Sequence, residues 1–495
     1  MSKIIIQNGN MCELDLPLKF AQKLYNEFAI RHPNAFYLRT RQRGMQNWDG
    51  KIHYITKTGQ FKIGLLPKVY DMCIEMGIKP KVVDMRQPLP KVSKVVTNIG
   101  KYKLRPEQEK AVKAVINNKI GNTPFHIGVL DYTVNAGKTL IMSSLYLSYK
   151  KQLKTLLITN DSDWLNQARE EFKQYLPGED ITFVQGKVLN WSNFTIGMVQ
   201  SISRNMRFYQ KELSQIDMVL VDEADQGGSK QYQNVITRLF NTRIRIGLSG
   251  TIYMSKLAKD KVKNMNLECF FGKVLAEFKL KDSIKKGYST KTIVKMVPGK
   301  PWYGNWESDC ISYKEIYDDS ITNCYTAWLM AYNRLLWNLN QGRYPALVVC
   351  KHIAHCENLY KFFKKKLGDA YNIAYVHVNT PSKLRQQIMK DFREGKIDIL
   401  VSTTIIARGK NFPKLKYLLN AASMDSQEKS IQFLGRLVRT DKSKNKVYLD
   451  DLHYPGNYLD RHGKHRKQYY QRQELKVILL DKLWKKHPNH SLIKS

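Results

Sequence analysis

Residues 126–151 read HIGVLDYTVNAGKTLIMSSLYLSYKK, and this stretch decides the fold. The apolar run at 126–132 has the length of a buried strand, and the residues after Gly-Lys-Thr have the length and composition of a helix. A Gly-Lys-Thr loop between a strand and a helix is typical of a phosphate-binding loop, because the free N–H groups at the start of the helix bind phosphate oxygens. The residues expected to form this loop are Asn135, Ala136, Gly137, Lys138 and Thr139.

Two side chains of this loop have separate chemical roles. Lys138 would balance the charge of the β- and γ-phosphates, and the Thr139 hydroxyl would be a ligand of Mg²⁺. The first glycine of the usual pattern falls at Tyr132, and Asn135 stands at another common glycine position. Because asparagine tolerates a left-handed backbone, we expect the loop to close.

A second chemical element is the sequence MVLVDEAD at 218–225. Its apolar residues predict a strand that delivers Asp222 and Glu223 to the carboxyl end, where parallel sheets bind ligands. Asp222 would hold Mg²⁺, and Glu223 would polarise the attacking water. The alternative is a solvated acidic pair at the end of a strand, but the phosphate loop in the same region favours hydrolysis of a nucleoside triphosphate.

Short apolar runs separated by helix-length segments occur in two sets. The first set is at 126–132, 155–159, 195–200, 218–222 and 244–250, and the second is at 346–351, 373–378, 398–404, 417–423 and 446–451. Runs that are apolar on both faces indicate parallel sheets. The predicted fold class is α/β, with two parallel-sheet lobes in tandem, a small N-terminal α+β domain and a basic C-terminal helix. The expected boundaries are 1–95 for the small domain, 96–270 and 271–455 for the lobes, with an insertion near 300–340, and 456–495 for the helix.

The composition indicates a polyanionic partner. The 495 residues include 81 Lys and Arg against 43 Asp and Glu, a net charge of +38 that is spread along the chain rather than confined to a tail. Phosphates balance such a surface best, so nucleic acid is the expected partner. An anionic membrane surface and a ribosome-bound role are the alternatives. The hydrophobic content of 43% excludes a mainly disordered chain.

The sequence carries no pattern typical of export or membrane insertion. No apolar run is long enough to span a bilayer, and the start, MSKIIIQNGNMCELDL, differs from a signal peptide. Seven cysteines without a C-x-x-C pair suit a reducing compartment. We therefore expect a cytoplasmic protein, in the host cytoplasm if the chain is viral, and a monomer, with oligomerisation left open.

Two arginines, Arg436 and Arg439, lie near the end of the second predicted lobe, in the sequence SIQFLGRLVRT at 430–440. Helical spacing puts Gln432, Arg436 and Arg439 on one face. Two arginines aimed at one point repel each other, so such a face usually addresses an anion, and a phosphoryl group in transfer is a natural candidate. An exposed basic helix is the alternative.

Taken in order, these elements resemble the motifs of superfamily 2 helicases over roughly residues 100–450. The matching segments are LRPEQ with Arg105 and Gln108, Gly137-Lys138-Thr139, Asp222-Glu223-Ala224-Asp225, Ser249-Gly250-Thr251, Thr403 to Asn411, and Gln432-x-x-Gly435-Arg436-x-x-Arg439. The resemblance implies two RecA-like lobes, with ATP between them and a single nucleic-acid strand across both.

The resemblance also assigns roles to residues. Gln108 would read adenine, Gln432 would act in catalysis, and Arg436 and Arg439 would be arginine fingers. Further ATP contacts are expected at Arg105, Gly409 and Asn411, coupling of hydrolysis to movement at Ser249, Gly250 and Thr251, and contacts with the nucleic-acid strand at Gln200, Ser201, Thr403 and Thr404.

The segment FYLRTRQRGMQNWDGKIHYI at 36–55 is similar to the region ahead of the motor in UvsW-type phage helicases, which share NWDG followed by a basic residue. The stretch CKHIAHCENL at 350–359 resembles motif IV of the same group. Those enzymes remodel branched DNA. The DNA contacts expected from these segments are Arg39, Arg41, Arg43, Trp48, Lys51 and His352. As an alternative, Trp48 and Phe36 belong to the core of the small domain.

A zinc site is a weaker interpretation of the second segment. Cys350, His352, His355 and Cys356 have suitable side chains, but their spacing differs from the usual C-x-x-C and H-x₃₋₅-H pairs. Cys350 also ends an apolar strand, where a thiol is ordinarily a small buried hydrophobe. We therefore expect no metal there.

The sequence predicts an ATP- and Mg²⁺-dependent DNA helicase or translocase that regresses forks, migrates Holliday junctions and unwinds R-loops, in phage replication, recombination and repair. A duplex translocase or restriction-type motor subunit is the first alternative. An RNA helicase is disfavoured because Gln432 stands where the DEAD-box group usually has His. A non-enzymatic architectural protein is disfavoured by Lys138 and Glu223.

Overall fold

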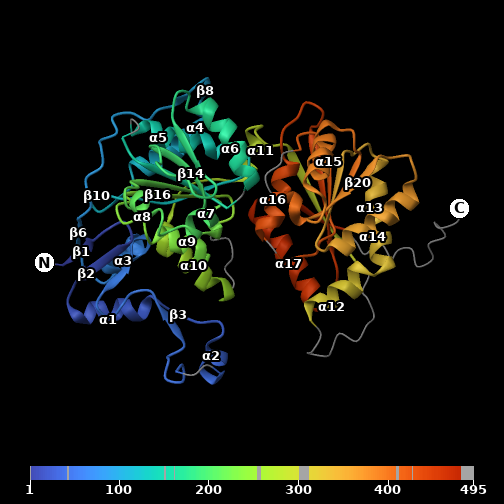
Figure 1. Ribbon diagram of the computed structural model, residues 1–495. Helices are drawn as coiled ribbons and strands as arrows, with labels where there is room; N and C mark the ends of the chain where they lie inside the picture. The colour runs from blue at the N-terminus through green and yellow to red at the C-terminus, as the bar shows by residue number, and fades with distance from the viewer. Residues whose placement is uncertain are drawn as a thin grey trace. The chain divides into compact units, whose positions relative to one another are not determined.

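The computed structural model describes residues 2–41, 44–149, 152–160, 162–252, 258–299, 312–407, 412–425 and 427–480. The chain divides into two compact units, unit 1 (Met1–Phe278) and unit 2 (Lys279–Ser495). Each unit contains one seven-stranded sheet, and a small four-stranded sheet lies near the N-terminus (Figure 1). The predicted α/β class, with two parallel sheets, is confirmed. Within the part of the chain that the structure describes, no helix is both long and apolar enough to span a membrane.

Unit 1 is built on a parallel sheet in the order β13-β14-β12-β15-β16-β11-β17. Its strands are β11 (His126–Tyr132), β12 (Thr155–Thr159), β13 (Ile181–Val184), β14 (Phe194–Met198), β15 (Met218–Asp222), β16 (Ile244–Ser249) and β17 (Val274–Phe278). The central strands are buried along their whole length, because helices cover both faces of the sheet. One face carries α4 (Pro106–Ile116), α5 (Lys138–Ser148) and α6 (Ser162–Tyr175), and the other carries α7 (Val199–Arg204), α9 (Lys230–Ile236) and α10 (Ala258–Phe271) (Figure 1).

The order of the strands brings distant motifs to one edge. Strand β16 lies between β15 and β11, and all three run parallel. Asp222 pairs with Leu248, and Asp131 pairs with Ser249, so the three strands end at the same level. The segments that follow them must therefore meet at the carboxyl edge of the sheet.

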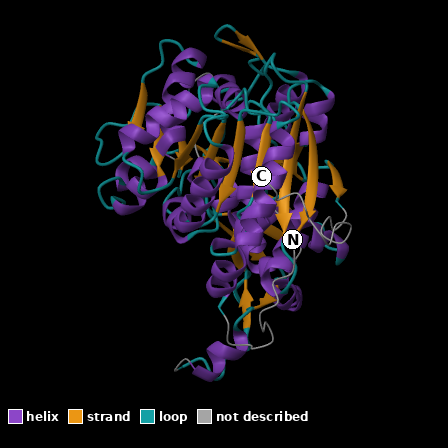
Figure 2. Cartoon of the chain, turned by 90° about the vertical axis from the view of Figure 1, so that its right-hand side faces the viewer, coloured by secondary structure: helices purple, strands orange, loops and turns teal. Residues whose placement is uncertain are grey.

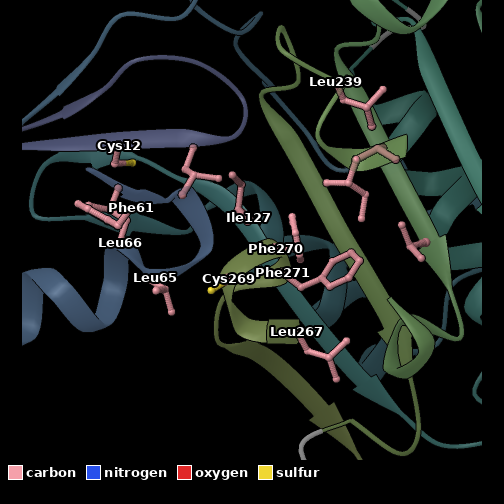
Figure 3. Close-up of a cluster of buried hydrophobic side chains, with 14 of the residues drawn as sticks. Cys12, Phe61, Leu65, Leu66, Ile127, Leu239, Leu267, Cys269, Phe270 and Phe271 are labelled. Atoms are coloured by element: carbon pink, nitrogen blue, oxygen red, sulfur yellow. The ribbon is translucent and has the colours of Figure 1, made fainter. Parts of the chain in front are cut away.

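The small N-terminal sheet has the order β5-β2-β1-β6. Its elements are β1 (Lys3–Ile6), β2 (Met11–Asp15), α1 (Leu18–Glu27), β5 (Gln60–Lys62), α3 (Leu66–Glu75) and β6 (Lys81–Asp84). Apolar side chains of this sheet and of α10 form one continuous core, in which Cys12, Phe61 and Leu66 lie near Cys269 and Phe270 (Figure 3). The small sheet is therefore fused to unit 1.

A buried arginine reinforces this junction. Arg245, on β16, is fully buried, and its guanidinium donates to Gly9 O at 2.5 Å, to Asn10 Oδ1 at 2.8 Å and to Phe270 O at 3.1 Å. Burial lowers the pKa of Arg245 to about 9. A side chain on Gly9 would come within 2.6 Å of Leu239 O, so the two backbones touch here.

An arm extends from the small sheet between α1 and β5. It consists of β3 (Ala29–Arg31), α2 (Ala35–Arg41) and β4 (Lys51–His53), and β3 pairs with β4 (Figure 1). We refer to these elements, with residues 44–50, as the arm. Further short elements of unit 1 are β7 (Asn98–Ile99), β8 (Tyr102–Lys103), β9 (Lys119–Ile120), β10 (Thr123–Pro124) and α8 (Gln210–Ser214).

Unit 2 repeats the architecture, with a parallel sheet in the order β20-β21-β19-β22-β23-β18-β24. Its strands are β18 (Lys291–Pro298), β19 (Ala346–Cys350), β20 (Ile373–Val376), β21 (Ile399–Thr403), β22 (Tyr417–Asn420), β23 (Lys446–His453) and β24 (Lys476–Leu479). Its helices are α11 (Leu280–Lys285), α12 (Tyr313–Tyr317), α13 (Tyr325–Leu339), α14 (Ile353–Leu367), α15 (Ser382–Glu394), α16 (Gln427–Leu437) and α17 (Asn457–Arg472). Figure 2 shows the alternation of strands and helices that results.

The structure differs from the sequence analysis at the C-terminal end. The expected helix is present as α17 but ends at Arg472, and residues 476–479 form β24, which pairs with β18. The expectation of a helix over 456–495 is therefore wrong at residues 476–479, because a short apolar run suits a strand equally well. In the region of the expected insertion, α12 and α13 contribute buried residues to the core of unit 2, and residues 301–311 lie outside the described residues.

Candidate nucleotide and nucleic-acid site

The loop after β11 has the backbone that a phosphate-binding loop needs. Gly137 precedes α5 with a φ of 73°, and Asn135 has a φ of 64°. The expectation that Asn135 adopts a left-handed backbone is confirmed. A side chain at Gly137 would come within 2.3 Å of Gln108 Nε2, so glycine is required there by conformation and by space.

The LRPEQ segment braces this loop. Gln108 is fully buried, and its Nε2 donates to Ala136 O at 2.8 Å while its Oε1 accepts from Arg105 N at 2.8 Å. Arg105 Nη2 donates to Asn135 O at 3.4 Å. Both residues therefore contact the loop backbone, and the amide of Gln108 is engaged before any nucleotide binds.

A lysine and two carboxylates meet at the carboxyl edge of the sheet. Lys138 Nζ lies 3.7 Å from Asp222 Oδ1 and 3.7 Å from Glu223 Oε1. Burial alone would lower the pKa of Lys138, but the nearby carboxylates of Glu223, Asp222 and Asp225 raise it to about 12. The ammonium of Lys138 is therefore charged. Glu223 has a left-handed backbone with a φ of 51°, a strained conformation that is common at functional sites.

The loop after β16 connects these two elements. Ser249 Oγ donates to Asp225 Oδ1 at 3.0 Å and lies 3.0 Å from Thr251 Oγ1. Gly250 sits against the start of the phosphate loop, where an added side chain would be 3.1 Å from Tyr132 O and from Thr133 Cα. Ser249, Gly250 and Thr251 thus touch both the acidic segment and the phosphate loop, as a coupling element requires.

The donor set fits a magnesium nucleotide. Thr139 and Asp222 offer a hydroxyl and a carboxylate, the oxygen ligands that Mg²⁺ prefers. The buried side-chain amide of Asn135 and the hydroxyl of Thr133 have no hydrogen-bond partner among the described residues. Buried polar groups without partners are rare in folded proteins. The amide of Asn135 and the hydroxyl of Thr133 can therefore form hydrogen bonds with a ligand.

The expected nucleic-acid contacts of unit 1 lie in two places. Gln200 and Ser201 are on α7, directly after β14, where Gln200 Nε2 donates to Asn160 O at 3.3 Å and Ser201 Oγ accepts from Gly186 N at 3.2 Å. The arm residues are Arg39, Arg41, Trp48 and Lys51, and Arg43 lies outside the described residues.

The aromatic residues of the arm differ in how much of each side chain is exposed. Phe36 is 80% exposed and Tyr37 is 56% exposed, and the Arg41 guanidinium lies 5.2 Å from the Tyr37 ring centre. Trp48 is half-buried, its ring edge meets His32, and its Nε1 donates to Lys51 O at 2.8 Å. Trp48 therefore contributes to the packing of the arm, whereas Phe36 does not.

The expected contacts of unit 2 follow the ends of neighbouring strands. Cys350 of β19 pairs with Thr403 of β21, so His352 and Thr404 follow at the same edge of this sheet. Arg436 lies in α16 and Arg439 just after it, and Arg439 O accepts from Thr290 Oγ1 at 3.1 Å. Gly409 and Asn411 lie outside the described residues, as does the side chain of Gln432.

The cysteine and histidine cluster of unit 2 packs within its core. Cys350, His355 and Cys356 are buried, and Tyr317 OH lies 3.0 Å from His355 Nδ1. Burial, followed by the charge of His352, lowers the pKa of His355 to about 3. The imidazole of His355 is therefore neutral and structural.

The sequence analysis missed a residue that supports the arginine-bearing helix. Lys444 is buried, and its Nζ donates to Leu437 O at 2.9 Å and to Leu415 O at 2.7 Å. It thereby ties the end of α16 to the segment before β22. Lys444 stands in the lysine-rich turn DKSKNK, and nothing in that turn distinguishes it from its exposed neighbours.

Unit 1 therefore brings the Gly-Lys-Thr loop, the acidic segment and the loop after β16 to one sheet edge, and unit 2 carries a second sheet of the same topology. This combination is typical of proteins that bind nucleoside triphosphates. Two family models match the chain, "Type III restriction enzyme, res subunit" at residues 101–254 and "Helicase conserved C-terminal domain" at residues 329–441. The chain belongs to the superfamily 2 helicases.

Individual relatives are distant. IRC3 of Saccharomyces cerevisiae, whose own assignment as an ATP-dependent helicase is provisional, is 23% identical over 70% of this chain. The match covers 51% of IRC3, so the chain spans about half the length of this curated relative. The UvsW structure from bacteriophage T4 is 19% identical, covers 97% of this chain and 98% of its own, and has a TM-score of 0.44. The DNA-bound restriction-modification enzyme LlaBIII has a TM-score of 0.57 and 14% identity, covering 83% of this chain and 34% of its own.

Proposed function

We propose that the chain uses ATP hydrolysis to remodel branched DNA: to regress forks, migrate Holliday junctions and unwind R-loops. The observation that carries this proposal is the arm of unit 1. It presents an exposed aromatic ring, Phe36, beside the exposed Arg39 and Arg41. Exposed rings stack on or separate bases, and arginines bind the flanking phosphates, so such a surface suits a point where strands part.

The attachment of the arm to unit 1 also supports a role in DNA remodelling. Its parent sheet shares a core with unit 1, and Arg245 of β16 fixes the loop at Gly9 and Asn10. The sheet from which the arm extends is therefore expected to move together with unit 1. We infer that the arm holds the branch point while the motor advances along one strand.

The proposed chemistry assigns one task to each group at the sheet edge. Lys138 leaves its carboxylate partners to bind the β- and γ-phosphates, and Glu223 accepts a proton from the attacking water. Thr139 and Asp222 would hold Mg²⁺, which when bound neutralises phosphate charge. Arg436, Arg439 and Gln432 would complete the site, with Gly409, Asn411 and Gln108 as further nucleotide contacts. Through their hydrogen bonds, Ser249 and Thr251 would transmit a change at Asp225 to the rest of unit 1.

A set of substrates tests the proposal. Wild-type protein is expected to separate strands of forked and four-way DNA more rapidly than strands of plain duplex or RNA. The double variant Arg39→Ala/Arg41→Ala should lose activity on branched DNA and keep ATP hydrolysis stimulated by single strands. Lys19→Ala/Lys23→Ala, which removes two exposed cations from α1, is the matched control. Equal activity on branched and plain substrates would contradict the proposal.

A duplex translocase that moves without separating strands is the second candidate. The match of residues 101–254 to a restriction-enzyme motor subunit favours it. Such a protein would displace a bound triplex-forming strand from duplex DNA yet leave forks and junctions intact, so the same set of substrates separates the two functions.

A further inference from the structure

At the β23-β18-β24 end of the sheet in unit 2, the described residues leave part of one face exposed. Burial alternates along β18, so that Thr292 and Val294 point into the core while Lys291, Ile293 and Lys295 point to the other, more exposed face. Register extends this face to the neighbouring strands, because Lys446 pairs with Lys291. The remaining members are Tyr448 of β23, which pairs with Ile293, and Lys476 and Ile478 of β24, which pair with Ile293 and Lys295.

Two aromatic rings hold a cation at the border of this face. Trp337, near the end of α13, is 41% exposed, and Lys295 Nζ and Arg343 Cζ lie 4.5 Å and 4.8 Å from its ring centre. Arg343 Cζ also lies 3.5 Å from the Tyr448 ring centre, and its Nη1 donates to Asn338 Oδ1 at 2.9 Å. The guanidinium is therefore fixed in place without a carboxylate.

Within the part of the chain that the structure describes, no carboxylate pairs with the cations of this face. Lys291, Lys295, Arg343, Lys446 and Lys476 form no ion pair within the described ranges. The carboxylate on this side of β23, Asp450, is buried and bound by Arg334 at 2.6 Å. The pKa of Lys295 is lowered, mainly because the side chain is partly buried. The charges of Arg334 and Arg343 add to this decrease, and the carboxylate of Asp450 opposes it. Crowded cations of this kind favour binding of an anion.

The dimensions of the face suit a polyanion. Lys291 and Lys295 are four residues apart, which is about 13 Å along a strand, and Lys446 lies on the next strand, about 5 Å away. A duplex carries one phosphate charge per roughly 1.7 Å of its axis, so a segment of this length presents several phosphates to the face. The rings of Trp337 and Tyr448 already bear cations, which leaves charge rather than base stacking as the means of recognition.

We propose that this basic face, formed by Lys291, Lys295, Trp337, Arg343, Lys446, Tyr448 and Lys476, binds the phosphate backbone of a duplex arm of the nucleic acid on which the motor acts. The inference rests on the proposed function and extends it with a second contact surface. Lys291, Lys446 and Lys476 are the first residues of their strands. His352 and Thr404 follow the opposite, carboxyl ends of other strands of the same sheet, so this face is separate from the motif residues.

The test uses the triple variant Lys291→Gln/Lys446→Gln/Lys476→Gln in the full-length chain. Affinity for a four-way DNA junction and for a short single strand is measured over a range of salt concentrations. The junction affinity is expected to fall roughly tenfold, and the slope of log affinity against log salt to decrease by about 2 to 3, because each lost duplex phosphate contact removes about 0.9. Binding of the short strand, ATP hydrolysis stimulated by that strand, and the melting temperature should stay unchanged.

The matched control removes the same charge elsewhere in unit 2, as Lys361→Gln/Lys365→Gln/Lys366→Gln on α14, where all three side chains are exposed. An equal loss in both triple variants, an equal loss for junction and single strand, or an unchanged salt slope would each overturn the inference. Failure of the proposed function is distinguishable, because a wild-type protein that binds junctions without remodelling them would still show the difference between the two triple variants.

Discussion

The two seven-stranded sheets are alike in topology but use buried charge in opposite ways. In unit 1, Lys138, Asp222 and Glu223 meet at the carboxyl edge, with 3.7 Å between the ammonium and each carboxylate. In unit 2, two buried carboxylates of β23 form close pairs with arginines of the helices, Asp450 with Arg334 of α13 at 2.6 Å and Asp451 with Arg466 of α17 at 2.8 Å. Loose contacts leave partners exchangeable, whereas close pairs do not. The same topology thus carries loose ionic contacts at the candidate site of unit 1 and close buried pairs in unit 2.

The pairs of unit 2 brace the helix that carries the arginines. Arg466 of α17 is fully buried, binds both oxygens of Asp451, and donates to Met424 O at 3.0 Å, just before α16. Asn420 and Tyr470 complete the partners of Asp451. The place of helix α16 in unit 2 is therefore fixed by side chains from α17 and β23.

Breaking such a pair is expected to have the largest effect. Arg466→Met leaves Asp451 buried without its cation and should lower the free energy of unfolding of unit 2 by about 3 to 5 kcal/mol. Urea denaturation followed by a unit 2 probe measures this. Lys464→Met on the same helix removes an exposed pair with Asp460 and should change stability by about 1 kcal/mol or less. Similar losses in both variants would contradict the distinction between the two units.

Removing the central cation of unit 1 should act on chemistry instead. Lys138→Ala is expected to lower the turnover number of ATP hydrolysis by roughly 10² to 10³, with the fold retained, because a preorganised contact with the phosphates is lost. Steady-state hydrolysis with and without single-stranded DNA measures this. Lys113→Ala on α4, which breaks an exposed pair with Glu109, is the control and should retain full activity. Normal turnover in Lys138→Ala would rule out the proposed site.

Unit 1 also contains a buried charge that serves the structure, at Arg245. Arg245→Met removes three hydrogen bonds between β16, the Gly9 loop and α10 and should cost about 2 kcal/mol, since the carbonyl groups of Gly9 and Phe270 stay buried without their donor. The first segment to become sensitive to protease should be the N-terminal sheet. Arg238→Met, at an exposed position of the same unit, should leave the digestion pattern unchanged.

The smallest expected effect is acid sensitivity at two buried histidines of unit 2. Burial lowers the pKa of His355 to about 3 and that of His462 to about 4. The unfolded chain binds protons at these histidines below about pH 6.5 and the folded chain does not, so stability is complete above that pH and falls as the pH drops towards 4. At pH 5.5 each histidine should cost about 1.4 kcal/mol. Melting temperatures of wild type and His355→Gln across this range test the prediction, and parallel curves would contradict it.

Local pattern predicted the strands and the helix around the candidate site better than it predicted the packing. The strand-loop-helix at 126–151 and the acidic segment at 218–225 are local signals, and both lie where the sequence placed them. Even the left-handed backbone of Asn135 followed from the residue type. Strand β24 was missed because it is defined by pairing with β18, far away in sequence.

Other features could not be predicted from the sequence because they also depend on contacts between distant segments. Arginine is ordinarily exposed, so nothing in the strand sequence IRIGLSG marks Arg245 as buried. The contact of Gln108 with the phosphate loop depends on how α4 packs beside α5, and the open face of unit 2 depends on the register of three strands. Each of these is a property of tertiary packing.

The buried guanidinium of Arg245 has a consequence for engineering. The change in sequence pattern near residue 95 suggests a seam at which the first segment could be exchanged between motors. The structure argues against it, because a cut there would expose Cys12, Phe61 and Leu66 on one piece and Cys269 and Phe270 on the other (Figure 3). It would also leave Arg245 facing water without the Gly9 and Asn10 acceptors. The N-terminal segment is thus not a transferable cassette, and chimeras should join at residue 278, where the two compact units divide.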